Sequence, residues 1–243
     1  FIYKRTRKKP EKVKKTLLDM VRNELGPDYD VDKHFTPSYN PWDQRLCLVP
    51  DSDLFEAIKN GSASVVTDHI DCFDDSGIKL KSGEHLDADI IVTATGLQLV
   101  MMGGADISVD SQLVDFSKLW TYKGLMVSDV PNMVSTFGYI NASWTLRADL
   151  TAEWVCRTLN HMTATNSSSI VPIVPEELKK MAARSWIDDF PAGYMQRVMH
   201  LFPKQGDREP WLNTQDLRRD RKIFNKPLAI DDALRFSNSG AKS

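Results

Sequence analysis

The sequence predicts a mixed α/β fold, and three observations support this prediction. The chain of 243 residues is 42% hydrophobic and 26% charged, which is the composition of an ordinary globular protein with one large core or two modest ones. Apolar residues recur at helical spacing over residues 10–25 and 142–162. Between these segments lie short apolar runs bounded by turn residues, which are typical of β-strands.

The first helix is expected over residues 10–25. Apolar side chains recur at helical spacing from Val13 to Leu25, Pro10 stands near the start, and Gly26-Pro27 follows the end. Residues 1–22 carry nine Lys and Arg side chains against two acidic ones, so the remainder of a chain with net charge −2 sums to −9. One interpretation of this basic helix is a contact with phosphate or nucleic acid. The favoured interpretation is a solvent-exposed helix face next to the rest of the protein. No aromatic residues interleave the charges, and no nucleic-acid partner is expected.

The next part of the chain predicts a long loop followed by two regular elements. Residues 27–45 are rich in Pro, Asp, Tyr and Asn, and loops of this length in compact domains are usually functional. A short buried strand is expected at Leu46–Val49. Asp51 or Ser52 is expected to cap a helix that ends at Gly61.

Five strands are expected in the middle of the chain. Three apolar runs, Ser64–Phe73, Gly77–Leu80 and Ala88–Thr95, are separated by polar turns and predict a three-stranded meander. Tyr122–Val127 and Asn132–Gly138 have the same character. With the strand at Leu46–Val49, these runs make up the expected sheet content of the fold.

The C-terminal part is predicted to be mainly helical and irregular. A long helix is expected over Ala142–Met162, followed by a Ser/Asn linker at Thr165–Ser169. Helical patterns return at residues 175–181 and 186–200. Residues 202–225 are expected to be mostly coil.

The bulk properties exclude several classes of protein. No window approaches the roughly 18 consecutive apolar residues of a membrane-spanning helix, so membrane contact is expected to be peripheral if it occurs. Cys47, Cys72 and Cys156 are odd in number and far apart, which argues against a disulfide framework and predicts a cytoplasmic protein. The five histidines have no metal-ligand spacing, so no metal site is expected. The opening at Phe1, without a signal peptide, predicts that the chain is a piece of a longer protein.

The most informative segment is Ala88-Asp89-Ile90-Ile91-Val92-Thr93-Ala94-Thr95-Gly96. By itself it predicts a buried strand that meets a turn, with Gly96 free to take a positive φ where the chain leaves the strand. With the meander before it, the segment resembles the Asp-x-x-x-x-Ala-Thr-Gly strand of flavoproteins with two dinucleotide-binding domains. In those proteins the strand links the pyridine-nucleotide domain to the FAD domain, so the resemblance implies that Gly96 lies at the cofactor.

Further motifs narrow the resemblance to one family. They occur in the same order over residues 10 to 236, nearly the whole chain: His34-Phe35-Thr36-Pro37, Tyr39-Asn40-Pro41-Trp42-Asp43-Gln44-Arg45-Leu46-Cys47, Pro50-Asp51-x-Asp53-Leu54-Phe55, Tyr122-Lys123-Gly124, Val130-Pro131-Asn132-Met133, Gly138-Tyr139-x-Asn141-Ala142-Ser143-Trp144-Thr145-Leu146 and Pro210-Trp211. Together they resemble Baeyer–Villiger flavin monooxygenases of the ethionamide-oxidising mycobacterial type. This resemblance implies FAD and NADPH as cofactors, and O2 with a ketone or a thio-compound as substrates.

Arg45 falls at the position of that family's active-site arginine. The resemblance implies a catalytic role, because a guanidinium stays protonated and stabilises negative charge that develops during oxygen transfer. The alternative is a surface arginine that pairs with Asp43. In some relatives a lysine precedes this arginine, whereas here the residue is Gln44, which places a contact with the NADP phosphate from this position in doubt.

The segment before the long helix is the expected flavin contact. By resemblance, the N-terminal amides of this helix, with Asn141, Ser143, Trp144, Thr145 and Leu146, face the electron-rich edge of the flavin. A plain helix cap made by Asn141 or Ser143 is the structural alternative, and the two are compatible.

The chain lacks the Gly-x-Gly-x-x-Gly motif that the family needs once for FAD and once for NADP. Both motifs are therefore expected upstream, in an N-terminal half that would complete the fold as a partner. On this basis residues 1–30 are a helical segment of the NADP domain, residues 31–95 its second half, and residues 96–243 the C-terminal part of an FAD domain. The predicted fold is thus an incomplete pair of Rossmann-like dinucleotide-binding domains, and a homo-oligomer is possible.

Two other functions remain open at this point. A related flavin monooxygenase that oxygenates nitrogen or sulfur would share the same motifs. A non-catalytic remnant that serves as a binding or structural module would also fit a chain without the glycine-rich motifs. We expect the upstream sequence to separate these alternatives.

Overall fold

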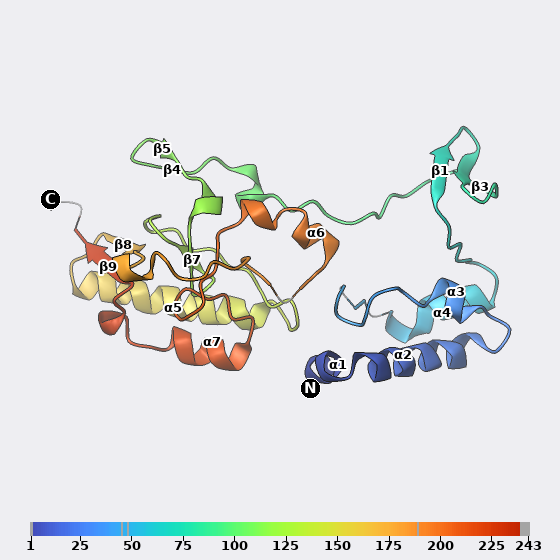
Figure 1. Cartoon of the computed structure of the whole chain (residues 1–243), viewed down its shortest axis with the longest axis horizontal. Helices are drawn as coiled ribbons and strands as arrows, with labels where there is room; N and C mark the ends of the chain where they lie inside the picture. The colour runs from blue at the N-terminus through green and yellow to red at the C-terminus, as the bar shows by residue number, and fades with distance from the viewer. Residues whose placement is uncertain (1, 45, 48, 189, 239–243) are drawn as a thin grey trace. The chain divides into compact units, whose positions relative to one another are not determined.

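The computed structural model describes residues 2–44, 46–47, 49–188 and 190–238, and it divides into two compact units, residues 1–97 and 98–243 (Figure 1). Helices and small antiparallel sheets occur in both units, which confirms the mixed α/β character of the fold. No helix among these residues is long and apolar enough to cross a membrane.

The first unit opens with two helices, α1 (Ile2–Lys8) and α2 (Pro10–Leu25). The second has the bounds that the apolar spacing predicts. Pro10 lies in its first turn, where the missing N–H would have had no helical partner, and Gly26 ends it with a φ of 86°. No side chain of α2 is buried, and Met20 is 59% exposed.

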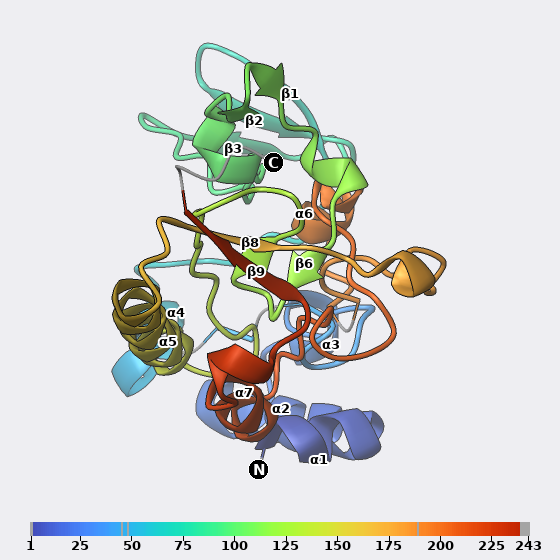
Figure 2. The ribbon, with the colours of Figure 1, turned by 90° about the vertical axis from the view of Figure 1, so that its left-hand side faces the viewer.

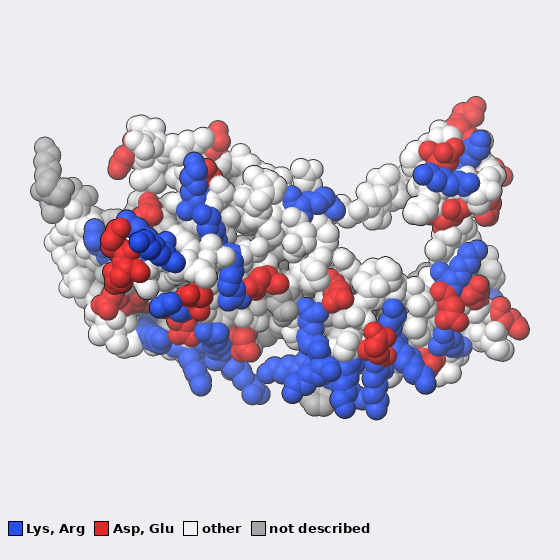
Figure 3. All heavy atoms as spheres, in the orientation of Figure 1, with Lys and Arg blue, Asp and Glu red and all other residues white. Residues whose placement is uncertain are grey.

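Basic side chains of these helices hold the loop that follows. Lys and Arg side chains gather along α1 and α2 (Figure 3). The Arg7 guanidinium donates to Asp43 at 2.8 Å, and the Lys14 ammonium donates to the carbonyl of Pro37 at 2.6 Å. Two of the basic side chains near the N-terminus therefore hold the loop at residues 27–45. The interpretation of the basic helix as a solvated face did not include these contacts.

The predicted loop at 27–45 contains a short helix, α3 (Val31–His34). The Asp30 carboxylate caps it by accepting from the amide of Lys33 at 3.0 Å, and Asp32 pairs with Arg22 at 2.7 Å. This short helix is compatible with the expectation that residues 27–45 form no regular element over most of their length. Four residues are too few for apolar periodicity to reveal a helix.

The strand expected at Leu46–Val49 is absent from its described residues, Leu46, Cys47 and Val49. Among the described residues no strand pairs with them to supply the hydrogen bonds that a strand requires. A 3-10 turn at Pro50–Ser52 then leads into α4 (Asp53–Lys59). Ser52 occupies the N-cap position as predicted, but its side chain makes no capping bond.

Three short strands form an antiparallel meander, β1 (Ile70–Phe73), β2 (Gly77–Leu80) and β3 (His85–Asp87), in that order. The first is shorter than predicted, and the third lies before the predicted segment. The run Ala88–Thr95 forms no strand, and Ile90 and Val92 are each 82% exposed. A strand needs a neighbour, and no described residues pair with this run.

The second unit is built around two helices, α5 (Thr145–Ala164) and α7 (Leu217–Phe224), which pack against each other. Strands β8 (Ser169–Pro172) and β9 (Leu234–Ser237) pair antiparallel beside them (Figure 2). The Asp216 carboxylate caps α7 by accepting from the amides of Arg218 and Arg219. The prediction of coil over residues 202–225 missed this helix.

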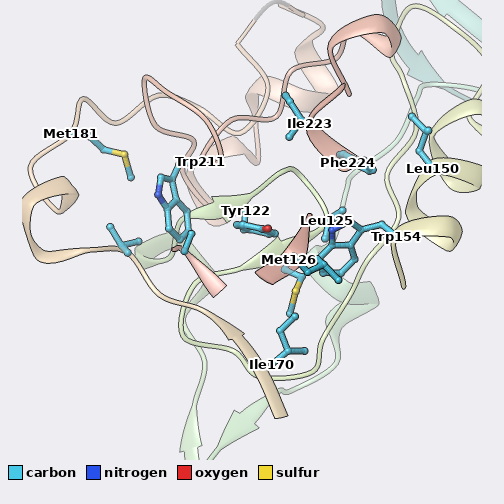
Figure 4. Close-up of a cluster of buried hydrophobic side chains, with 13 residues drawn as sticks. Tyr122, Leu125, Met126, Leu150, Trp154, Ile170, Met181, Trp211, Ile223 and Phe224 are labelled. Carbon is cyan, nitrogen blue, oxygen red and sulfur yellow. The ribbon is translucent and has the colours of Figure 1, made fainter. Parts of the chain in front are cut away.

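The main core of this unit is aromatic. Tyr122 lies between Trp154 of α5 and Trp211, with ring centroids 6.2 Å and 6.0 Å away, and all three side chains are fully buried (Figure 4). Truncation of one such tryptophan to alanine would cost about 3–5 kcal/mol. This cluster fixes α5, whose N-terminus carries the predicted flavin contact.

Two further strand predictions are corrected in this unit. The segment Tyr122–Val127 is a hairpin of β6 (Thr121–Tyr122) and β7 (Met126–Val127), because Lys123 and Gly124 have φ of 51° and 67° and reverse the chain. Residues 132–138 form no strand, since they make single hydrogen bonds to separate segments instead of a ladder.

The remaining elements are short. The helical pattern at 175–181 yields a 3-10 turn at Glu176–Leu178, and the pattern at 186–200 yields α6 (Gly193–Gln196) and a 3-10 turn at Met199–Leu201. β4 (Ser108–Val109) pairs with β5 (Gln112–Leu113). Further 3-10 turns lie at Met101–Gly104, Phe116–Lys118 and Leu228–Ile230.

Candidate functional site

The candidate site is the loop at residues 138–144 and the N-terminus of α5 that it leads into. The loop folds back tightly at Gly138, where a Cβ atom would lie 2.2 Å from the Cγ atom of Trp144. Only glycine fits this approach. The Trp144 ring is 49% exposed and packs against Phe137 with ring centroids 4.8 Å apart.

The N-terminus of α5 is exposed and lacks a side-chain cap. The expected cap by Asn141 or Ser143 is wrong: Asn141 donates to the carbonyl of Gln215 at 3.3 Å, and the hydroxyl of Ser143 bonds that of Thr145 at 2.8 Å. The first turn holds no acidic residue. The amides at this end, those of Thr145 and Leu146 included, therefore present partial positive charge that no carboxylate of the first turn offsets.

A buried arginine lies directly behind this surface. Arg147 is in the first turn of α5, its side chain is 1% exposed, and it donates to Asn213 Oδ1 at 2.6 Å and to the carbonyl of Lys123 at 2.9 Å. Its Nε atom lies 3.4 Å from Asp220 of α7. Burial lowers the pKa of Arg147 and the Asp220 charge opposes this, so the guanidinium remains a cation.

Tyr139 and Thr214 complete the surroundings of the Asp220 carboxylate. The Tyr139 hydroxyl donates to Oδ2 of Asp220 at 2.8 Å, and the hydroxyl of Thr214 donates to Oδ1. Burial, with the Asp220 charge, raises the pKa of Tyr139 far above its usual range, so the phenol stays a neutral donor. The carboxylate thus has donors on both oxygens and balances the charge of Arg147.

The site therefore combines an exposed outer face with a rigid, charged support. The outer face, from Ala142 to Thr145, offers backbone amides, two hydroxyls and an aromatic ring. This arrangement suits an electron-rich or anionic edge of a planar ligand, because helix N-terminal amides attract negative charge.

Comparison with curated proteins shows a relationship over almost the whole chain. The chain is 45% identical over 240 residues to the FAD-containing monooxygenase EthA of Mycobacterium tuberculosis. This alignment covers 99% of the chain and 48% of the relative. The chain is similar over almost its whole length to the EthA-like FAD-containing monooxygenases. This confirms the resemblance seen in the sequence motifs.

Two other members of this monooxygenase family match over the same extent. Identity is 45% over 235 residues to the probable FAD-binding monooxygenase AlmA of Acinetobacter baylyi, covering 97% of this chain and 47% of the relative. It is 39% over 237 residues to the putative FAD-containing monooxygenase MymA of Mycobacterium tuberculosis, with the same coverage. The chain spans about half the length of these curated relatives. No family model matches the chain, and no solved structure matches it.

The other residues that the sequence assigns to the monooxygenase site lie in the first unit. Arg45 is outside the described residues, so its catalytic role stays a prediction. Asp43, its alternative partner, is bonded to Arg7. Gly96 has a φ of 100°, as the small-residue exit from an apolar run predicts, and among the described residues beyond its chain neighbours no atom lies within 4 Å of where its Cβ would be. Its contact with a cofactor also stays a prediction.

Sequence reasoning missed the buried polar groups behind the site. Arg147 shares the helical spacing of Leu150 and Trp154, so a charged residue on the buried face was visible in the pattern. Asp220 could not be paired with it, since that contact joins two helices far apart in the chain.

A second buried ion pair lines a cavity of about 530 Å³ elsewhere in this unit. The Lys123 ammonium, 1% exposed, donates to Asp231 at 2.7 Å, and the Tyr122 hydroxyl donates to the same oxygen at 2.6 Å. Burial lowers the pKa of Lys123, whereas Asp231 opposes that shift. No group of three or more His, Cys, Asp or Glu in the described part of the chain is placed to hold a metal.

Proposed function

We propose that this chain is the C-terminal half of an FAD- and NADPH-dependent monooxygenase of the Baeyer–Villiger type. The intact protein would insert one oxygen atom of O2 into ketones or oxidise sulfur compounds. The observation that carries the proposal is the alignment of 99% of the chain with a named FAD-containing monooxygenase at 45% identity. Because the chain spans about half of that relative, the activity is proposed for the whole protein.

The surface at the start of α5 fits one edge of FAD. Its exposed amides have no carboxylate in the first turn and no side-chain cap, so they are available to an electron-rich group. Asn141, Ser143, Trp144, Thr145 and Leu146 are the residues that would hold this edge. Bound FAD would supply the activation of oxygen, which the side chains of this chain do not provide.

The chain's own residues would position the flavin and stabilise charge. The amides of Thr145 and Leu146 favour negative charge on the outer face, and the buried Arg147–Asp220 pair fixes the start of α5 behind it. Arg45 would stabilise negative charge on oxygen near the substrate, because a guanidinium remains protonated throughout. Gly96 would let the backbone pass close to the cofactor.

The same proposal assigns the parts of the fold. Residues 1–30 would be a helical segment of the NADP domain, residues 31–95 the second half of that domain, and residues 96–243 the C-terminal part of the FAD domain. The apolar run at Ala88–Thr95 supports this assignment, because its exposure is explained if its strand partners belong to the other half.

The test is oxygen incorporation by the full-length protein. The purified protein would be given FAD, NADPH, isotopically labelled O2 and a panel of cyclic ketones, thioethers and thioamides. We expect one labelled oxygen in an ester or sulfur oxide, and one NADPH consumed per product. Products confined to nitrogen and sulfur oxides would favour the related N- and S-oxygenating class. Absence of any oxidation with FAD bound would contradict an enzymatic function.

A further inference from the structure

We infer that Gln215 is a positioning residue that holds the loop before α5, and through it the exposed amides of the helix. Its significance for catalysis rests on the proposed function, whereas its effect on the loop does not. Gln215 lies between Thr214 and the N-cap of α7, outside every motif that carries the family resemblance.

The Gln215 side chain makes two bonds with the loop backbone. The amide of Ile140 donates to its Oε1 atom at 2.9 Å, and its Nε2 atom donates to the carbonyl of Gly138 at 3.3 Å. These bonds bracket Tyr139, which is fully buried. The backbone carbonyl of Gln215 also accepts from the side chain of Asn141. Gln215 thus bonds three of the four loop residues from Gly138 to Asn141, all except the buried Tyr139.

Gln215 is itself held in place by the buried polar network. Its Nε2 atom also donates to Asn213 Oδ1 at 3.1 Å, and the same oxygen accepts from Arg147 at 2.6 Å. Its backbone has a φ of 47°, a left-handed conformation that side chains other than glycine and asparagine rarely adopt. Such a conformation persists only where the surroundings determine it. The glutamine is therefore a fixed reference point for the loop.

The loop depends on this residue because the helix has no cap of its own. Most helices begin with a side chain that bonds the first free amides, and α5 lacks one. In the described part of the chain no hydrogen bond joins the exposed residues Ser143, Trp144 and Thr145 to residues 213–220, so Gln215 acts on them through the backbone. It sets where the amides point, and it does not touch what they bind.

The first test is amide hydrogen exchange on the 243-residue chain. Gln215→Leu removes both side-chain bonds to the loop and the bond to Asn213, whereas Gln215→Glu keeps the acceptor for Ile140 and loses the donor to Gly138 and Asn213. Gln196→Leu is the matched control, because it removes a glutamine bond to a backbone carbonyl, that of Phe190, in the same unit. We expect exchange at residues 138–146 to accelerate about ten-fold in Gln215→Leu, as the loss of a partly buried hydrogen bond implies. The glutamate variant should be intermediate, and the control unchanged at these residues.

The second test is FAD binding by the full-length protein. In Gln215→Leu we expect the Kd for FAD to rise at least about ten-fold and the reduction potential of the bound flavin to shift, with a smaller change in Gln215→Glu. Gln196→Leu should retain wild-type values of both. If Gln215→Leu does not fold, the Kd for FAD and the reduction potential measured in Gln215→Glu test the inference.

The outcomes separate this inference from the proposed function. Unchanged exchange at residues 138–146 would overturn the inference. Faster exchange with an unchanged Kd and potential would also overturn it, since the loop would then be structural alone. If the wild-type protein binds no FAD, the proposed function fails, and the exchange result still decides whether Gln215 positions the loop.

Discussion

At the scale of single residues, Arg147 shows how a charge supports the candidate site from inside the protein. The guanidinium and the Asp220 carboxylate are each 1% exposed, and the groups around them satisfy both. Such a pair adds little net stability compared with apolar residues, but removal of one partner leaves a buried charge without compensation. The pair is therefore best understood as a device that fixes geometry at the start of α5.

Arg147→Met should reduce the free energy of unfolding by about 3–5 kcal/mol, because the Asp220 carboxylate loses its counter-charge in a buried place. The double variant Arg147→Met with Asp220→Asn should lose less than the sum of the two single variants, since no buried charge then remains. Urea unfolding followed by fluorescence measures all three. Strict additivity would show that the two side chains do not interact.

Arg45→Ala in the full-length protein should prevent oxygen insertion while NADPH still reduces the flavin. Hydride transfer requires alignment of two cofactors, whereas the later steps create negative charge on oxygen. Removal of one stabilising donor typically costs on the order of 3 kcal/mol, or at least about a hundred-fold in rate. Stopped-flow absorbance and product chromatography measure the two half-reactions separately. Arg45→Lys should also fail, because an ammonium does not reproduce the planar fork. Product formation at the wild-type rate would remove Arg45 from the site.

At the scale of elements, the loop that leads to Arg45 is held by the basic helices. Asp43 accepts from Arg7 at 2.8 Å and from the backbone amide of Asn40 at 3.1 Å. Asp43→Ala should release this loop and lower the yield of oxygenated product per NADPH. A half-exposed pair is worth up to about 1 kcal/mol, so the effect should stay within about five-fold. Lys12→Ala, which removes a charge from α2 but no loop contact, is the control. An equal loss in both variants would point to a general charge effect.

We expect the order of the β1–β3 meander to depend on pH through Asp74 and His85. The amide of Ser76 and then His85 lower the pKa of Asp74 to about 2, and the hydrogen bond that the His85 ring donates to Asp74 raises the pKa of His85 above 6.5. The contribution of Asp74 is present above pH 3.8 and is lost as the pH falls toward 2. That of His85 is present below pH 6.5 and is lost as the pH rises through its raised pKa.

The turn should therefore be most ordered between about pH 4 and 6.5. Hydrogen exchange at residues 74–87 across the pH range, corrected for intrinsic rates, would measure this. His85→Gln should abolish the change at higher pH and keep that at lower pH. A flat profile in the wild type would contradict the assignment of this pair.

Elements were predictable from the sequence where their determinants are local. α2 and α5 follow from apolar spacing and, in α2, from Pro10 and Gly26. α7 was missed because it has eight residues and is mostly charged, although Asp216 marks its start. The strand predicted at Ala88–Thr95 failed because pairing depends on distant partners, which a local pattern does not contain. For the same reason Arg147, whose partner Asn213 is 66 positions away, was not assigned.

At the scale of the whole molecule, the two units differ in how well they bury their apolar residues. The second unit encloses three clusters of buried side chains, whereas α2 and α4 contain none. Exposed apolar side chains concentrate from β1 to the start of the second unit. They are Ile70, Phe73, Ile90, Ile91, Val92, Leu97 and Val100. An apolar run of this kind, without a neighbouring strand, is a site for pairing with another chain.

The 243-residue chain expressed alone should therefore self-associate and bind little FAD. The residues proposed to face the flavin cover one edge of it, and this chain has no glycine-rich loop to cradle a pyrophosphate. Light scattering after size-exclusion chromatography, with the flavin absorbance of the same fractions, measures both properties.

Replacing Ile90 and Val92 together by lysine should reduce association, because both side chains are 82% exposed and like charges then oppose pairing. The same substitutions in the full-length protein should instead impair folding, since there the run would be covered by strands of the other half. A monomeric, yellow chain with stoichiometric FAD would show that these 243 residues form a complete cofactor site, and the proposed division between two halves would then be wrong.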